Sequence, residues 1–245
     1  MQCFVYQPRR YRNICHVEGL EQYRVCEKES DLLVLADHDI RDQAQKLLHT
    51  IRQELTDYIS VHPEYGASLN PVQVPAYAPW IVQCMAEASA RLGVGPMAAV
   101  AGAISESIAQ NLNASGCDII IENGGDIFAF FKKPLKVALY AGSSPLSMKI
   151  GLSVSGCATG MSICTSSGSV GHSLSYGNAD AVSVVARDGA LADATATALG
   201  NRVQNAADID GVLDYGIGIE GILGIVIVVG QHIGIKGDLV ELCCM

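Results

Sequence analysis

Residues 118–131 have the sequence DIIIENGGDIFAFF, in which two apolar runs flank the polar tetrapeptide Asn123-Gly124-Gly125-Asp126. Asn and Gly tolerate the positive φ angles of tight hairpin turns, so this stretch predicts two antiparallel strands joined at the tetrapeptide. Turn geometry does not explain the carboxylates of Glu122 and Asp126, because a charge is costly to bury beside apolar strands. Two interpretations stay open: an ordinary hairpin turn, or a turn that contacts a bound ligand.

Helices are predicted before this hairpin and mainly strands after it. Apolar residues recur at helical spacing from Ile40 to Ile59, with Asp39 as the expected cap, and two more helical stretches cover 80–92 and 96–112. A small antiparallel sheet is expected within 1–36, and further strands at 136–140, 149–154, 159–164, 181–186, 224–229, 232–235 and 238–242. Helices are expected at 189–199, capped by Asp188, and at 206–213. The pattern predicts one composite α+β domain over residues 1–245, with antiparallel sheets packed against helices.

Composition limits the classes of protein and partner. Of the 245 residues, 49% are hydrophobic and 17% charged, which predicts a packed globular protein rather than a disordered chain. The formal net charge of −9 disfavours duplex nucleic acid and anionic membranes as partners. We therefore expect a small-molecule ligand, no nucleic acid and no membrane, and we leave a homo-oligomer open.

Cysteine usage and the N-terminal sequence concern localisation. Nine cysteines, an odd number with no CxxC pair, are typical of free thiols in a reducing cytoplasm. The first residues, MQCFVYQPRRYRN, lack the apolar stretch of a signal peptide, and the apolar run Ile222–Val229 is far shorter than the roughly 20 residues that span a bilayer. We expect a cytoplasmic protein.

Common nucleotide and hydrolase motifs are absent or out of context. Residues 216–221, GIGIEG, fit GxGxxG, but the predicted elements around them run helix to strand, the reverse of a dinucleotide-binding loop. The sequence has no GK[ST], HExxH or GxSxG motif. P-loop, zincin and α/β-hydrolase chemistries therefore lose support.

A second polar segment follows the predicted strand 159–164. It begins Thr165-Ser166-Ser167-Gly168-Ser169 and continues with Gly171-His172-Ser173, which combines hydroxyls, backbone N–H groups and an imidazole. Such a loop can hold an anion, with His172 as a general base. The alternative is a Ser/Gly loop with ordinary side-chain turns.

The predicted helix 189–199 carries a candidate metal site. Asp193 and Thr197 are four residues apart, so both oxygens lie on one helical face and could be offered to one hard cation such as Mg²⁺. Two oxygens are an incomplete Mg²⁺ set, and a polar helix face is the alternative. From Gly151 onward there are three basic against nine acidic residues, so a phosphate bound here would depend on a divalent metal and backbone donors.

Three segments together resemble the superfamily of ApbE-type FAD:protein FMN transferases: residues 123–126, residues 165–168 and the helix segment ADATATA at 192–198. The stretches HPEYGASLNPV, GVGPMAAVAGAISE, CTSSGSVGHSLSYGNADAV and GIKGDL, at 62–72, 93–106, 164–182 and 234–239, are more similar still to an uncharacterised, cytoplasmic sister family of ApbE-like proteins. The resemblance covers nearly the whole chain.

This resemblance implies an ApbE-like, tunnelling-fold-like α+β architecture. It implies that Asp193 and Thr197 occupy the Mg²⁺ site and that 123–126 and 165–168 line the cleft for FAD or another phosphate-bearing nucleotide. Two features depart from the transferases: the Asp-Pro-x-Thr-Gly segment after their histidine is missing behind His172, and their lysine is replaced by alanine near Ala101.

These departures leave several functions open. One is Mg²⁺-dependent flavinyl (FMN) or phosphoryl transfer, and a second is a non-catalytic module that binds a small ligand. A third is an enzyme acting on another purine- or pterin-like heterocycle.

Overall fold

The computed structural model describes residue 12 and residues 17–113, 116–168 and 176–245. The strands in this part of the chain are β1 Glu21–Glu27, β2 Ser30–Ala36, β3 Ile119–Asn123, β4 Asp126–Phe131, β5 Leu135–Ala138, β6 Ile150–Val154, β7 Cys157–Ser166, β8 Ala181–Ala186, β9 Ile222–Val229, β10 His232–Lys236 and β11 Glu241–Cys244. The helices are α1 Arg41–Val61, α2 Pro63–Ala67, α3 Trp80–Leu92, η2 Pro96–Ala99, α4 Val100–Leu112, α5 Gly189–Gly200, η3 Ala206–Asp208 and α6 Ile209–Ile217. The α+β class predicted from the sequence is confirmed.

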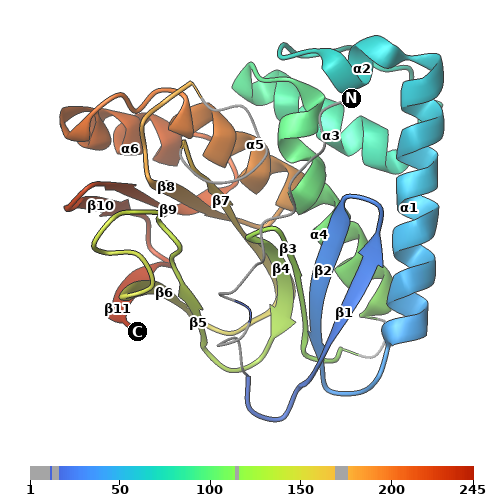
Figure 1. Cartoon of the computed structure of the whole chain (residues 1–245), viewed down its shortest axis with the longest axis horizontal. Coiled ribbons are helices and arrows are strands. Elements are labelled where there is room, and N and C mark those ends of the chain that lie inside the picture. The colour runs from blue at the N-terminus through green and yellow to red at the C-terminus, as the bar shows by residue number, and fades with distance from the viewer. Residues whose placement is uncertain (1–11, 13–16, 114–115, 169–175) are drawn as a thin grey trace.

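An eight-stranded antiparallel sheet lies at the centre, in the order β1-β2-β3-β4-β7-β8-β9-β10. Helices α1, α3, α4, α5 and α6 lie on one side of it, and a three-stranded sheet, β11-β6-β5, lies on the other (Figure 1). Alternate residues of each central strand therefore face two different cores. Ile121 and Phe128 belong to the core beneath the helices, whereas Ile120 and Ala129 pack toward the small sheet.

The N-terminal hairpin is part of the main sheet and not a small sheet of its own. Strand β2 pairs with β3 from Leu32 opposite Asn123 to Ala36 opposite Ile119. All seven residues of β2 are buried, which is typical of a strand covered on both faces. This pairing places the N-terminal β1–β2 hairpin beside the β3–β4 hairpin, although helices α1 to α4 separate the two in the sequence.

Most predicted elements match the structure closely. The bounds of α3, β4 and β8 are as expected, and Asp188 caps α5 by accepting a hydrogen bond from the Leu191 N–H at 2.7 Å. Residues 216–221 connect α6 to β9, so the exclusion of a dinucleotide loop agrees with the observed element order.

Among the helices that the structure describes, no single one is long and apolar enough to cross a membrane. Helix α3 and the η2–α4 segment reach that length and composition together, but they meet at 104°.

Candidate functional site

Helices α4 and α5 cross with their backbones in contact. A Cβ atom added at Gly102 would lie 2.1 Å from the carbonyl oxygen of Gly189, and one added at Gly189 would lie 2.4 Å from that of Gly102. No side chain fits into this crossing, so glycine is required on both helices. The close approach places the N-terminal turn of α4 against the first two turns of α5.

Asp193 of α5 uses this approach to cap α4. Its Oδ2 atom accepts hydrogen bonds from the backbone N–H of Ala101 at 3.1 Å and of Gly102 at 2.9 Å. These N–H groups belong to the first turn of α4 and have no partner within their own helix. The carboxylate therefore also gains from the positive end of the α4 dipole.

The turn 123–126 reaches the same place from the sheet. Asp126 Oδ1 accepts a hydrogen bond from the Thr165 N–H at 3.0 Å, and its backbone oxygen accepts one from Ser105 Oγ of α4 at 3.1 Å. The Asn123 side chain approaches the Ala101 carbonyl at 3.5 Å. The hairpin turn, the end of β7 and the start of α4 thus converge on Asp193.

The carboxylates of Asp193 and Asp126 are near enough for their charges to interact. Burial raises the pKa of Asp193 well above its usual range, and the negative charge of Asp126 raises it further, against the effect of the two α4 hydrogen bonds. Burial raises the pKa of the Cys164 thiol, and the charges of Asp126 and Asp193 raise it further. The thiol is therefore near both carboxylates. Such a pair of acids is stabilised by a bound cation or by a shared proton.

Glu122 and Asp126 have different roles. Glu122 Oε2 accepts a hydrogen bond from the Nε of buried Arg12 at 2.6 Å, and its Oε1 accepts one from the Gly125 N–H at 2.6 Å. Arg12 also pairs with Asp31 at 2.9 Å. Both carboxylate oxygens of Glu122 therefore have hydrogen-bond donors, on the side of the hairpin that faces the three-stranded sheet, and the bond to Gly125 stabilises the turn. Asp126 lies on the side that faces the helices.

The two glycines of the turn have backbone conformations that favour glycine, and one of them lies beside space that no side chain in the described part of the chain fills. Gly124 and Gly125 have φ angles of 74° and 107°, which side chains rarely adopt. A Cβ atom at Gly125 would meet no atom of the described residues within 4 Å. The glycines are thus explained by the hairpin, and Gly125 borders unfilled space.

The segment Thr165–Gly168 lies at the same end of the sheet, but its groups have internal partners. Thr165 Oγ1 pairs with Ser183 at 2.8 Å, and the Gly168 N–H donates to Ala179 at 2.9 Å. Ser166 is buried, and Ser167 also has an interaction within the protein. Because the N–H groups of Thr165, Gly125 and Gly168 all donate within the protein, they do not form a ready anion cradle.

Of the remaining predicted site residues, Thr197 is half-buried one helical turn beyond Asp193, as their spacing requires. His172, the predicted general base, lies outside the described residues. The structure therefore gathers Asp193, Asp126 and Asn123 around the start of α4. Thr197 lies on the same face of α5 as Asp193.

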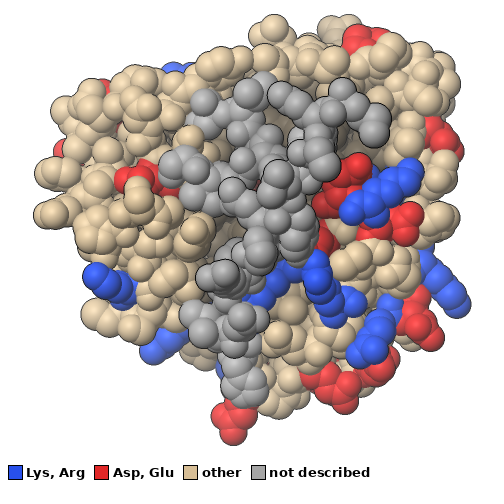
Figure 2. Space-filling view, in the orientation of Figure 1, with Lys and Arg blue, Asp and Glu red and all other residues tan. Residues whose placement is uncertain are grey.

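The three basic residues that follow Gly151 are engaged elsewhere. Arg187 donates to Cys157 at 2.7 Å, Arg202 lies 4.1 Å over the ring of Tyr215, and Lys236 pairs with Asp214. On the face shown in Figure 2, acidic and basic side chains are intermixed, mainly toward β1, β2 and α1. Positive charge for an anionic ligand is therefore not supplied by these three residues.

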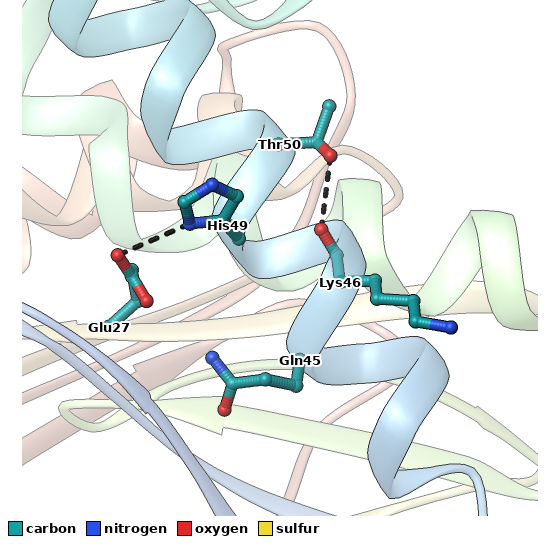
Figure 3. Close-up of a pocket in the computed structure, with 5 residues that line it drawn as sticks. All are labelled: Glu27, Gln45, Lys46, His49 and Thr50. Carbon is teal, nitrogen blue, oxygen red and sulfur yellow. Dashed lines mark hydrogen bonds and ion pairs between the residues drawn. The ribbon is translucent and has the colours of Figure 1, made fainter.

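A shallow recess of about 570 Å³ lies away from this cluster, between β1 and α1 (Figure 3). His49 Nδ1 lies 3.4 Å from Glu27 Oε1, and Thr50 donates to the Lys46 carbonyl of its own helix at 3.0 Å. These are ordinary contacts of an exposed helix surface. The recess shares no residue with the carboxylate cluster of Asp126 and Asp193.

Three contributors were not predicted from the sequence. Glu106 accepts a hydrogen bond from the Gly189 N–H at 2.7 Å, Arg12 holds Glu122, and Gly102 permits the helix crossing. Glu106 carries a visible signal, since it is an acidic residue inside the otherwise small and apolar segment AGAISESIA. Arg12 and Gly102 have no such signal, because their partners are far away in the sequence.

Comparisons with solved structures agree with this arrangement of helices and sheets. The flavinyl transferase ApbE of Pseudomonas stutzeri, in its apo form, aligns with a TM-score of 0.53 and 14% identity over 89% of this chain and 93% of that one. The ApbE protein of Thermotoga maritima aligns with a TM-score of 0.58 and 12% identity over 89% of this chain and 97% of that one. At these identities the likeness shows the fold.

Sequence comparisons show the family. A UPF0280 protein of Methanococcus aeolicus is 45% identical over 78% of this chain and 79% of its own length. One of Methanocaldococcus jannaschii is 41% identical over 89% of this chain and 91% of its own length. A family model described as AbpE bacteria matches residues 12–213. The chain therefore belongs to this family of the ApbE-like superfamily, together with the UPF0280 proteins.

Proposed function

We propose that this chain binds Mg²⁺ at Asp193, Asp126 and Thr197 and holds the phosphate groups of a flavin or another nucleotide against that cation, for flavinyl or phosphoryl transfer. The observation that carries the proposal is the convergence of Asp193 and Asp126 on the first turns of α4, to which both are hydrogen-bonded. The charge of Asp126 raises the pKa of buried Asp193, and two carboxylates that interact in this way favour a bound divalent cation.

The donors fit Mg²⁺ in kind. Carboxylate and hydroxyl oxygens are the ligands this ion prefers, and it is usually held by one or two carboxylates, waters and substrate phosphates. Both α4 hydrogen bonds use Oδ2 of Asp193, so Oδ1 is the oxygen we assign to the cation. Thr197, on the same face of α5, would add a hydroxyl.

The protein's own groups would then orient the ligand. Mg²⁺, when bound, would offset the charge of the phosphate oxygens. The backbone N–H groups of the turn and of the β7 end are already engaged, so they shape the site more than they bind the phosphates. Open space beside Gly125 is where we expect the ligand to approach. His172 stays a predicted general base.

Whether the protein uses FAD as a substrate tests this proposal. Ala101 lies at the proposed site, with its N–H on Asp193 and its carbonyl near Asn123, and the resemblance implies that alanine replaces the lysine of the transferases near this position. We expect the purified chain with FAD and Mg²⁺ to release AMP far more slowly than a flavin transferase such as the Pseudomonas stutzeri enzyme. Mass spectrometry of the native protein should identify a co-purifying phosphate-bearing ligand whose retention needs Mg²⁺.

Two results would count against the proposal. A co-purifying ligand without a phosphate group, retained equally well in a chelator, would contradict it. A ligand that is bound with Mg²⁺ but never converted would favour the second candidate, a non-catalytic binding module, which the alanine at position 101 also favours.

A further inference from the structure

Three side chains with different metal-binding chemistry meet at the end of the sheet opposite the carboxylate cluster. We propose that Asp37, His38 and Cys117 form a binding site for a divalent transition metal of the Zn²⁺ class. One carboxylate oxygen, one imidazole nitrogen and one thiol sulfur all lie within 4.8 Å of one another. The site is separate from the proposed Mg²⁺ site and does not depend on it.

Strand pairing builds this cluster from distant parts of the sequence. Asp37 and His38 directly follow β2, and Cys117 lies two residues before β3. Because Ala36 at the end of β2 pairs with Ile119 at the start of β3, the residues just beyond these strand ends, Asp37, His38 and Cys117, lie at the same end of the sheet. The predicted hairpin turn begins at the other end of β3, at Asn123, six residues and roughly 20 Å along the strand from Cys117.

The three groups already contact one another. Asp37 Oδ1 lies 2.5 Å from His38 Nδ1. A hydrogen bond with His38 and a weaker effect of one with Cys117 lower the pKa of the Asp37 carboxyl group, against the opposing effect of burial. The side chains of His38 and Asp37 are 53% and 42% exposed, so a metal ion can enter from solvent.

The donor types select the metal. Thiolate, imidazole and carboxylate together suit Zn²⁺ or Co²⁺ and not Mg²⁺, which prefers oxygen alone. Ligand atoms about 2.0–2.3 Å from a tetrahedral Zn²⁺ lie roughly 3.3–3.8 Å apart, so small side-chain rotations would suffice. Three protein ligands on an exposed edge leave the fourth position for water.

A neighbouring cavity supplies an independent observation. Cys117 and Asn113 line a small cavity of about 40 Å³ at this edge. The Oδ1 atom of Asn113 is buried and has no hydrogen-bond partner in the described part of the chain. A rotation of the Asn113 side chain would turn this oxygen toward the cavity, where a metal-bound water would give it a partner.

Titration with Co²⁺ tests the proposal on the full-length chain, after it has been reduced and freed of metal by dialysis. We expect one equivalent to give a thiolate-to-cobalt charge-transfer band that Zn²⁺ displaces and excess Mg²⁺ does not. Cys117→Ser should abolish the band. His38→Ala should weaken binding by more than the about 10- to 100-fold that loss of a supporting residue costs. Both positions lie at the surface or half-buried, so the variants should fold.

Two controls separate this site from the other thiols. Cys26→Ser removes an exposed cysteine that also contacts an aspartate, Asp31, at 3.4 Å, but forms no such cluster with an imidazole of the described residues. It should keep the band, as should the double change Cys243→Ser with Cys244→Ser. A wild-type chain without the band, a Cys117→Ser variant that keeps it, or a loss of the band with either control would overturn the proposal.

Discussion

Glu106 on α4 accepts a hydrogen bond from the backbone N–H of Gly189, the first residue of α5, at 2.7 Å. Asp193 on α5 in turn accepts two hydrogen bonds from the first turn of α4. Each helix thus caps the start of the other across the Gly102–Gly189 contact. This reciprocal capping fixes Asp193 in front of the hairpin turn.

The stability of the protein should depend on pH through Glu106. Burial, followed by the charge of Asp188, raises the pKa of Glu106 from its ordinary 4.5 to about 7. Between these values the native state holds a proton that the unfolded chain has lost, so the free energy of unfolding falls as pH rises. The effect is on the order of 3 kcal/mol.

Glu106→Gln should remove this dependence, because the amide oxygen can still accept the Gly189 N–H. Urea unfolding between pH 4.5 and 8 measures it. We expect the variant to gain stability relative to the wild type as pH rises through the window. Parallel stability profiles for the two proteins would show that Glu106 does not titrate in this range.

The helix crossing should not tolerate a side chain. Gly102→Ala places a methyl group 2.1 Å from the Gly189 carbonyl, and such overpacking typically costs about 1–3 kcal/mol or more. Gly211→Ala is a matched control in α6, because its added Cβ meets nothing within 4 Å. The control should stabilise the protein by about 0.4–1 kcal/mol. Equal unfolding midpoints for both variants would refute the close crossing.

Arg12 should matter far more than its neighbour Arg24, although both pair with Asp31. Arg12 is buried and pairs with two buried carboxylates, so Arg12→Ala should cost about 3–5 kcal/mol by removing the cation beside Glu122 and one of the two beside Asp31. The Arg24 side chain is 53% exposed, and Arg24→Ala should cost about 1 kcal/mol or less. Denaturant unfolding compares the two, and similar losses would contradict the buried network.

Much of the fold follows from local signals. The apolar periodicity predicts α1 and α3, the Asn-Gly-Gly turn predicts the β3–β4 hairpin, and Asp188 marks the start of α5. The sheet order was not predictable in the same way, because pairing of β2 with β3 is decided by burial on both faces and by a long connection. The N-terminal hairpin was therefore expected as a separate small sheet.

The residues of the candidate site can be singled out from the sequence, but their contacts cannot. Helical spacing singles out Asp193 and Thr197, and the turn singles out Asp126, yet their meeting depends on tertiary packing. In the sequence Glu122 and Asp126 are equally good candidates for ligand contact. Strand alternation places them on opposite faces of the sheet, Glu122 toward Arg12 and Asp126 toward Asp193. The engagement of the Thr165 and Gly168 N–H groups is likewise invisible before folding.

Mg²⁺ binding tests the central claim most directly, because this ion discriminates against the softer cluster around Cys117. Calorimetric titration should compare the wild type with Asp193→Asn, which keeps an oxygen for the α4 N–H groups and removes the charge. Thr197→Val removes only a hydroxyl, and Asp188→Asn is a matched control, since Asn also caps helices well.

We predict that the wild type binds one Mg²⁺, that Asp193→Asn abolishes binding, that Thr197→Val weakens it, and that Asp188→Asn leaves it unchanged. At 100 times the dissociation constant, the ion should also stabilise the wild type by about 2.7 kcal/mol. Unchanged Mg²⁺ affinity in Asp193→Asn, or a wild type that binds no Mg²⁺ at millimolar concentration with or without nucleotide, would contradict the account.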